Sequence, residues 1–324
     1  MSKILITGGS GFIGTNMIEF LLKFDHEIIN LDIKFPKNFN HKNLWRELDI
    51  CNYSLLKQEI TNFNPDYIIH LAARTDLNEN KSISGYKSNI EGVENLMNIS
   101  SKLPNLKRII IASSMLVCKV GYIPKSINDY CPSSLYGESK VMTEKIVKKY
   151  DFDWVIVRPT SIWGPWFAQP YFNFFKLVMN GFYFNIKRDS AATKTYGYVK
   201  NTCIQISDIL FSSSDIVKNN YFYLGDSVPI NITDWSHLIR FSINKRKLIT
   251  IPLFVIYIAS LFGDFLRFFK IYNFPLNTFR YYNMTTDNVI KNLNKTELVT
   301  SIENHIDLKE AVNQTIDWIN RINK

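Results

Sequence analysis

A run of glycines near the beginning of the sequence constrains the fold of this chain more than any other feature. The apolar run Ile4–Thr7 is typical of a buried strand and leads into the loop Gly8–Gly14, which fits both GxGxxG and GxxGxxG. Helical periodicity follows over Phe12–Phe24. A strand, a glycine loop and a helix in this order predict a tight turn, where the free N–H groups and positive dipole end of the helix meet a phosphate.

The first half of the chain alternates between strand and helix patterns. After Ile4–Thr7, strand-like runs occur at Glu27–Leu31, Tyr67–Leu71, Arg108–Ala112 and Trp154–Val157, separated by segments of helix length. Such alternation is typical of a parallel sheet with helices on both faces. We therefore expect an α/β fold, a doubly wound parallel sheet of the Rossmann type, with a smaller mixed α/β lobe toward the C-terminus.

An acidic residue indicates that the ligand of the glycine loop is a dinucleotide. Asp32 lies 18 residues beyond Gly14, at the end of the next strand-like run. A carboxylate there accepts hydrogen bonds from the ribose hydroxyls and repels a 2′-phosphate. The sequence therefore favours NAD over NADP as the cofactor, although Lys34, two residues further on, weakens this preference.

The pattern changes after Arg158-Pro159, where aromatic residues, Asn and turns become frequent. We expect an NAD-binding domain over residues 1–165, to which residues 195–217 return, and a substrate-binding lobe over residues 166–324. Because no Gly/Ser-rich linker separates the parts, they are expected to share an interface.

A candidate catalytic group follows the strand-like run Arg108–Ala112. Tyr136 and Lys140 are spaced i, i+4, which places them on one face of a helix. A phenol with its ordinary pKa of about 10 is a poor base at neutral pH. A nearby ammonium group favours the phenolate and so lowers that pKa. The hydroxyl of Ser114 can then hydrogen-bond the same substrate oxygen.

Together, these features resemble the extended short-chain dehydrogenases/reductases of the nucleotide-sugar epimerase/dehydratase group. The resemblance covers nearly the whole chain. Its markers are Thr7–Gly14, Asp32, Asp49-Ile50, His70–Ala73, Asn89 with Gly92, Ser113-Ser114, Tyr136 with Lys140, Arg158-Pro159 and Tyr198-Val199.

The resemblance implies roles for individual residues. Tyr136 is the catalytic acid/base, Lys140 tunes it and holds the nicotinamide ribose, and Ser114 orients the substrate hydroxyl or keto group. Asp49 and Ile50 flank the adenine. The implied cofactor contacts are Gly8, Gly11, Phe12, Ile13, Gly14, Asp32, Asp49, Ile50, Leu71, Ala72, Ala73, Asn89, Tyr136, Lys140 and Pro159.

In similar enzymes the second lobe holds a nucleoside-diphosphate sugar, so we expect such a sugar as the substrate. A diphosphate needs cations. Lys194 occupies the position where the family pattern has a phosphate-facing Arg, and Arg280 is a second candidate. Ser161 replaces a residue that is often Asn in relatives. We expect these three residues to contact the substrate, and the aromatic segment Ile162–Phe167 either lines the same pocket or belongs to the core.

The residues after Ser114 narrow the choice of reaction. Similar dehydratases carry Asp-Glu directly after the catalytic hydroxyl residue, whereas Met115 and Leu116 stand there in this chain, which disfavours dehydration. No thiol and imidazole pair suits a 3,5-epimerase. The expected reaction is 4-epimerization through a transient 4-keto sugar, with NAD regenerated in each cycle. An NAD(P)H-dependent 4-keto reductase and a non-catalytic NAD-binding protein remain alternatives. Non-catalytic relatives commonly lose the catalytic Tyr or Lys, whereas this chain keeps both.

Composition excludes several other classes of function. The net charge is +9, but the Lys residues are spread along the chain and no nucleic-acid-binding motif accompanies them, so no nucleic-acid partner is expected. The four Cys have no CxxC spacing, which indicates free thiols in a reducing compartment and no metal site. A strand-like run begins at Lys3, so we expect no signal peptide and a cytoplasmic protein. The resemblance implies a homodimer and a role in polysaccharide biosynthesis.

The strongest apolar stretch is Leu248–Gly263. It is shorter than the roughly 20 residues that a membrane span needs. We expect a buried helix of the second lobe and no association with a membrane surface. Attachment to such a surface, helped by the preceding basic triplet Lys245–Lys247, is the alternative.

Overall fold

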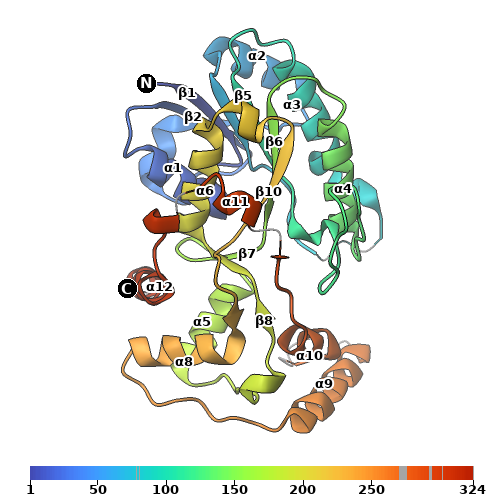
Figure 1. Cartoon of the computed structure of the whole chain (residues 1–324), viewed down its shortest axis with the longest axis vertical. Coiled ribbons are helices and arrows are strands. Elements are labelled where there is room, and N and C mark those ends of the chain that lie inside the picture. The colour runs from blue at the N-terminus through green and yellow to red at the C-terminus, as the bar shows by residue number, and fades with distance from the viewer. Residues whose placement is uncertain (78, 80, 270–275, 292–293, 301, 324) are drawn as a thin grey trace. The chain divides into compact units, whose positions relative to one another are not determined.

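The structure, a computed structural model, describes residues 1–77, 79, 81–269, 276–291, 294–300 and 302–323. Its central feature is a seven-stranded sheet in the order β10-β6-β5-β4-β1-β2-β3, with every pair of neighbours parallel (Figure 1). The strands are β1 (Lys3–Thr7), β2 (Glu27–Asp32), β3 (Trp45–Glu47), β4 (Tyr67–His70), β5 (Arg108–Ala112), β6 (Trp154–Pro159) and β10 (Asn220–Leu224).

Helices cover both faces of this sheet, which confirms the expected doubly wound α/β fold. One face packs against α1 and α6, and the other against α2, α3 and α4. Because the inner strand β1 is covered on both sides, Ile4, Leu5 and Ile6 are all fully buried. The helices are α1 (Phe12–Leu21), α2 (Tyr53–Phe63), α3 (Val93–Ser100), α4 (Leu135–Val147), α6 (Val199–Phe211), α7 (Ser214–Val217) and α11 (Asn294–Glu297).

Parallel pairing determines where functional side chains can gather. The register aligns Thr7 of β1 with His70 of β4, and His70 with Ile111 of β5. The loops that follow these strands therefore leave the sheet at the same edge. In α/β sheets, ligands bind at this carboxyl edge of the strands.

The chain divides into two compact units. The first consists of Met1–Phe167, Gly197–Gly225 and Lys291–Ile306, and the second of Ala168–Tyr196, Asp226–Ile290 and Asp307–Lys324. The return of Lys291–Ile306 to the first unit was not indicated by the sequence.

The described residues of the second unit form helices and very short strands. Its core contains the fully buried Trp235, against which the rings of Tyr171, Phe174, Phe175 and Tyr196 pack. The elements are α5 (Tyr171–Asn180), β8 (Thr193–Lys194), β11 (Ile230–Asn231), α8 (Ile232–Ser242), α9 (Leu253–Phe268), α10 (Thr278–Thr285) and α12 (Leu308–Ile322). β8 pairs with β11, while β7 (Ser161–Trp163) pairs with β9 (Tyr196–Tyr198).

The strongest apolar stretch departs from its expected burial. It forms the end of a loop and most of α9, and many of its large side chains are exposed, Phe254 and Ile258 by more than 60%. The expectation of a buried helix is therefore wrong. The residues of α9 that pack inward include the small Ser260 and Gly263, so the bulky apolar side chains lie on the other side. Among the described residues, no helix combines the length and the hydropathy that crossing a bilayer requires.

Candidate active site

The loop Gly8–Gly14 makes a sharp turn between β1 and α1. Gly8 has a φ of 74°, in the left-handed region that favours glycine. A Cβ on Gly8 would lie 2.4 Å from the backbone nitrogen of Ala72, and a Cβ on Gly14 would lie 2.3 Å from the carbonyl oxygen of Gly8. Close backbone packing therefore requires glycine at both positions.

The N-terminus of α1 has no side-chain cap. Its N-cap residue is Gly11. The preceding N–H groups already have acceptors: Gly9 donates to Asn30 Oδ1 at 2.9 Å, and Ser10 donates to Asp32 Oδ2 at 3.0 Å. The first N–H groups of a helix lack intrahelical acceptors. They can therefore bind the pyrophosphate of a dinucleotide, and the residues present fit the predicted NAD.

Asp32 lies beside this loop at the end of β2. Its carboxylate accepts hydrogen bonds from the backbone N–H groups of Ser10, at 3.0 Å, and Lys34, at 2.9 Å. Burial raises the pKa of Asp32, and these two backbone donors oppose that shift. Two backbone bonds fix the orientation of the carboxylate, and its remaining lone pairs can accept ribose hydroxyls.

We expect Asp32→Ala to weaken NAD binding by roughly tenfold or more, because a hydrogen bond to a charged group contributes about 1.5–3 kcal/mol. NADP binding is not expected to weaken, since the repulsion of its 2′-phosphate is removed. Isothermal titration calorimetry with both cofactors measures the change. The exposed Asp25→Ala is the matched control. Equal losses for NAD and NADP would contradict the role of Asp32.

Two further predicted cofactor segments follow neighbouring strands. Leu71–Ala73 leaves β4, and the Leu71 N–H donates to the carbonyl oxygen of Thr7 at 2.9 Å, which holds this half-buried loop against the glycine loop. Asp49 is exposed, whereas Ile50 is buried in the core of the first unit. Their contacts with an adenine stay predictions.

Asn89 is buried in a short π-helical segment, Ser88–Gly92, before α3. Its Nδ2 donates to the carbonyl oxygen of Arg74 and to Ser139 Oγ, both at 3.0 Å, and its Oδ1 accepts from the Arg74 N–H at 2.8 Å. The amide thereby ties the loop after β4 to α4. We infer that Asn89 positions these two segments around the cofactor.

The three predicted catalytic residues lie together in the first unit. Ser114 follows β5, and its side chain hydrogen-bonds that of Tyr136. Tyr136 and Lys140 lie one turn apart in α4, whose N-terminus is capped by Ser134. Lys140 Nζ donates to the carbonyl oxygen of Ala112 at 2.8 Å, at the end of the same strand.

Burial shifts both titratable members of this group. It raises the pKa of Tyr136 to about 12, and the hydrogen bond with Ser114 acts in the opposite direction. It lowers the pKa of Lys140 to about 8, against the attraction of the Glu144 carboxylate. At neutral pH, Tyr136 is therefore a neutral phenol and Lys140 an ammonium ion. A cation near the phenol favours its deprotonation.

Sequence reasoning missed Glu144, which is fully buried in α4. Its carboxylate accepts hydrogen bonds from Arg158 Nε at 2.8 Å and Nη2 at 2.7 Å, from Ser113 Oγ at 2.6 Å and from the Tyr130 hydroxyl at 2.8 Å. This network joins α4 to the ends of β5 and β6, and so fixes the helix that carries Tyr136 and Lys140. The sequence signal that could have indicated Glu144 was its position four residues after Lys140, on the same face of the helix.

The predicted substrate residues belong to different units. Pro159 ends β6, and the half-buried Ser161 begins β7. In the second unit, Lys194 is buried in β8, which lowers its pKa to about 8 despite the nearby carboxylate of Asp287. Arg280 is exposed in α10. Their contacts with a substrate stay predictions.

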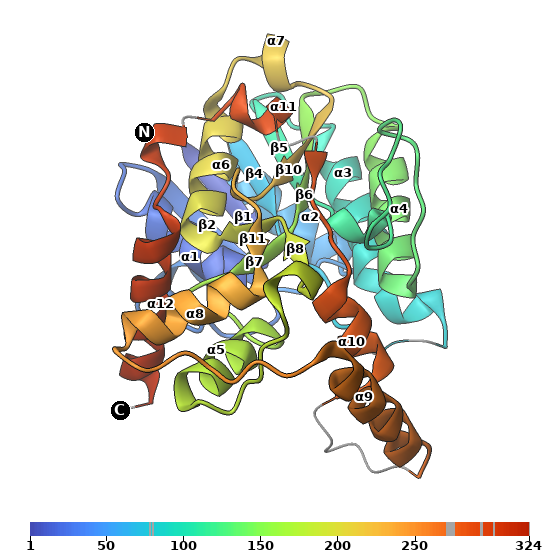
Figure 2. The ribbon, with the colours of Figure 1, turned by 60° about the horizontal axis from the view of Figure 1, so that its bottom comes forward.

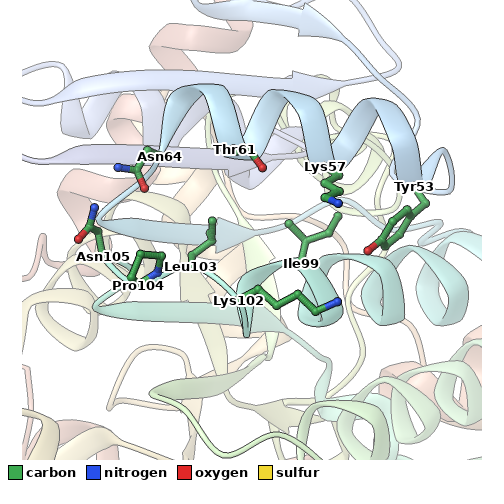
Figure 3. Close-up of a pocket in the computed structure, with 9 residues that line it drawn as sticks. All are labelled: Tyr53, Lys57, Thr61, Asn64, Ile99, Lys102, Leu103, Pro104 and Asn105. Carbon is green, nitrogen blue, oxygen red and sulfur yellow. The ribbon is translucent and has the colours of Figure 1, made fainter.

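A surface cavity of about 420 Å³ lies elsewhere, between α2 and the C-terminal end of α3 (Figure 3). It is lined by Tyr53, Lys57, Thr61, Asn64, Ile99, Lys102, Leu103, Pro104 and Asn105. Asn64 and Asn105 precede β4 and β5, whereas Ser114, the predicted partner of Tyr136, follows the carboxyl end of β5. This cavity is therefore not part of the candidate active site.

Comparisons with known proteins agree with this geometry. The profile of the "NAD dependent epimerase/dehydratase family" matches residues 4–197. The UDP-glucose 4-epimerase of Vibrio cholerae is 31% identical over 192 residues, which are 55% of this chain and 57% of that protein. The dTDP-glucose 4,6-dehydratase of Haemophilus influenzae is 26% identical over 176 residues, which are 46% and 52% of the two chains. This chain thus spans about half the length of these curated relatives.

Solved structures extend the similarity in fold to the whole chain. The crystal structure of UDP-glucuronic acid 4-epimerase from Bacillus cereus in complex with NAD has a TM-score of 0.73 to this chain at 19% sequence identity. The superposition covers 99% of this chain and 100% of that one. At this level of identity, the likeness shows a common fold.

Proposed function

Since this chain belongs to the NAD-dependent epimerase/dehydratase family, we propose that it inverts the configuration at C4 of a nucleoside-diphosphate sugar through a transient 4-keto sugar. The names of both curated relatives above specify sugars carried on nucleotides. One of these relatives is a 4-epimerase and the other a 4,6-dehydratase. The residues that follow Ser114 favour the first of these reactions.

The observation that carries the proposal is that no acidic or basic side chain directly follows Ser114, which leaves Tyr136 as the acid–base group. Ser114 is followed by Met115 and Leu116, both half-buried in a 3₁₀ turn. Removing water from a sugar requires a further acid/base pair, which similar dehydratases supply at these two positions. Neither Met115 nor Leu116 can exchange a proton. Epimerization requires one group that takes a proton and later returns it, and Tyr136 suffices for that.

The positions of these side chains support a role for each of them in the proposed reaction. The ammonium of Lys140 favours the loss of the Tyr136 proton to water, which leaves a phenolate. This phenolate takes the proton of the sugar 4-hydroxyl and becomes a phenol, while Ser114 hydrogen-bonds the same oxygen. NAD, when bound, supplies the oxidant and then the reductant for C4. After the keto sugar has presented its other face, Tyr136 returns the proton to O4.

The diphosphate of the substrate is assigned to cations of the second unit. Lys194 is a cation below its pKa of about 8, and Arg280 is exposed on α10. Arg matches phosphate oxygens with its planar fork, whereas Lys acts as a point charge. Ser161 is assigned to the sugar.

Turnover of a panel of UDP-, dTDP- and GDP-sugars tests the proposal. Products are separated chromatographically while the absorbance of the reduced nicotinamide is followed. We expect a 4-epimer with no net change in that absorbance. Consumption of added NADH or NADPH in step with product would instead identify a 4-keto reductase. NAD binding without turnover of any sugar would identify a non-catalytic protein. Either result would overturn the proposed function.

A further inference from the structure

The helix α9 of the second unit carries large apolar side chains on the side that faces away from the protein. Each of them is between 46% and 83% exposed. We refer to them as the apolar face of α9: Phe254, Ile258, Leu261, Phe262, Phe265 and Phe268. The buried residues of the helix are Ile256, Ser260 and Gly263. An ordinary surface helix has the opposite arrangement, with its large apolar side chains inward.

The apolar face is one continuous stripe. Its members recur at intervals of three or four residues, so they share one side of the helix. The 16 residues of α9 span roughly 24 Å at 1.5 Å per residue. Its one acid, Asp264, accepts hydrogen bonds from the backbone N–H and hydroxyl of Thr278 at the start of α10. α9 and α10 lie side by side in both views (Figures 1 and 2), so this carboxylate points to the protein side.

Positive charge accompanies this stripe. The exposed triplet Lys245–Lys247 begins the loop that leads into α9. The exposed Arg267 lies in the last turn of the helix, four residues after Gly263 and therefore not on the stripe itself. From Lys245 to Phe269 the sequence holds four basic residues and one acid, Asp264. The loop also exposes the apolar side chain of Ile249 by 70%. The excess of positive charge in this segment therefore favours an anionic partner for the apolar face of α9.

We propose that the apolar face of α9 inserts into an anionic lipid surface, with Lys245–Lys247 on the lipid headgroups. A protein interface is enriched in Phe as well as in Tyr, Trp, Met and Arg, but it also carries about one hydrogen bond per 100–200 Å². The apolar face contains only Phe, Ile and Leu, whose side chains have no polar atom to pair, and hydrocarbon requires none. Because no described helix can cross a bilayer, the attachment is peripheral. This inference does not depend on the reaction catalysed.

Vesicle flotation of the full-length protein tests this inference. We expect binding to vesicles of phosphatidylcholine mixed with phosphatidylglycerol, and weaker binding to phosphatidylcholine alone. The variant Ile258→Gln/Phe262→Gln/Phe265→Gln is expected to bind at least about a hundredfold more weakly to the mixed vesicles, because it removes three large apolar contacts. The variant Lys245→Gln/Arg246→Gln/Lys247→Gln is expected to lose roughly a hundredfold as well, at about fivefold per charge near the surface.

The matched control replaces three similarly exposed apolar residues of the first unit, Leu55→Gln/Ile123→Gln/Ile216→Gln. It is expected to bind vesicles as the unchanged protein does. An equal loss in this control would overturn the assignment to α9. Failure of the unchanged protein to bind the mixed vesicles would overturn the lipid surface as the partner. If sedimentation then shows a dimer that the α9 variant dissociates, the partner is a second copy.

Circular dichroism and NAD binding establish that each variant is folded. Should the α9 variant fail to fold, vesicle flotation of the variant Lys245→Gln/Arg246→Gln/Lys247→Gln tests the inference by itself. Its substitutions lie on an exposed loop, so they are expected to leave folding and NAD binding unchanged. Undiminished binding of that variant to mixed vesicles would contradict the proposed contact with headgroups.

Discussion

Replacing Tyr136 with Phe is expected to lower turnover of the nucleotide sugar by about 10²–10⁴-fold, the usual contribution of a positioned acid–base group. The change removes one hydroxyl, the atom that hydrogen-bonds Ser114 and exchanges the proton. The ring itself remains buried near Tyr86, with 6.0 Å between the ring centroids. NAD affinity and the melting temperature are therefore expected to stay close to those of the unchanged protein.

Steady-state kinetics and calorimetry with NAD measure the two effects separately. Tyr150→Phe is the matched control, because Tyr150 lies just beyond the other end of α4 and has no assigned role in the reaction. It is expected to retain full turnover. If Tyr136→Phe also retained full turnover, the acid–base assignment would fail. A loss of NAD binding together with turnover would make Tyr136 a binding or folding residue instead.

The second large effect concerns the buried network around Glu144. We expect Glu144→Ala to lower the free energy of unfolding by about 3–5 kcal/mol, because it leaves the guanidinium of Arg158 buried without its counter-charge. That guanidinium is 1% exposed and donates two hydrogen bonds to the carboxylate. Ser113 and Tyr130 also lose their acceptor. Urea unfolding followed by circular dichroism measures the change.

A control on the same helix separates this effect from a general weakness of α4. Glu138 is exposed, so Glu138→Ala is expected to change stability by no more than about 0.5 kcal/mol. The double variant Glu144→Leu/Arg158→Met removes both charges and is expected to recover part of the lost stability. A Glu144→Ala protein as stable as the Glu138→Ala control would show that the network does not fix α4.

The central sheet was predictable where strands are buried on both faces. Ile4–Thr7, Tyr67–Leu71 and Arg108–Ala112 are mostly apolar runs, and the structure has strands there with ends that differ by at most one residue. Two other strands were missed. β3 has three residues and two of its side chains are exposed, so it lacks an apolar run. β10 lies in the aromatic-rich half, where its pattern does not stand out from the surrounding residues.

The residues of the candidate site likewise divide into those that the sequence could predict and those that it could not. Gly8, Gly14, Tyr136 and Lys140 were predictable, because local spacing along one loop or one helix turn sets their geometry. The partnership of Glu144 with Arg158 joins a helix to a strand, and only the tertiary fold brings them together. The exposure of α9 was missed for a related reason. Hydropathy identifies an apolar helix, but it does not tell which side the rest of the chain covers.

The most direct test of the proposed 4-epimerization follows the hydrogen at C4. A nucleotide sugar that the protein turns over is prepared with deuterium at C4, and the product is analysed by mass spectrometry and NMR. The proposal predicts that the 4-epimer retains the deuterium at C4, because the same atom leaves and returns within one catalytic cycle. A 4-epimer that has exchanged its deuterium for solvent hydrogen would contradict this account.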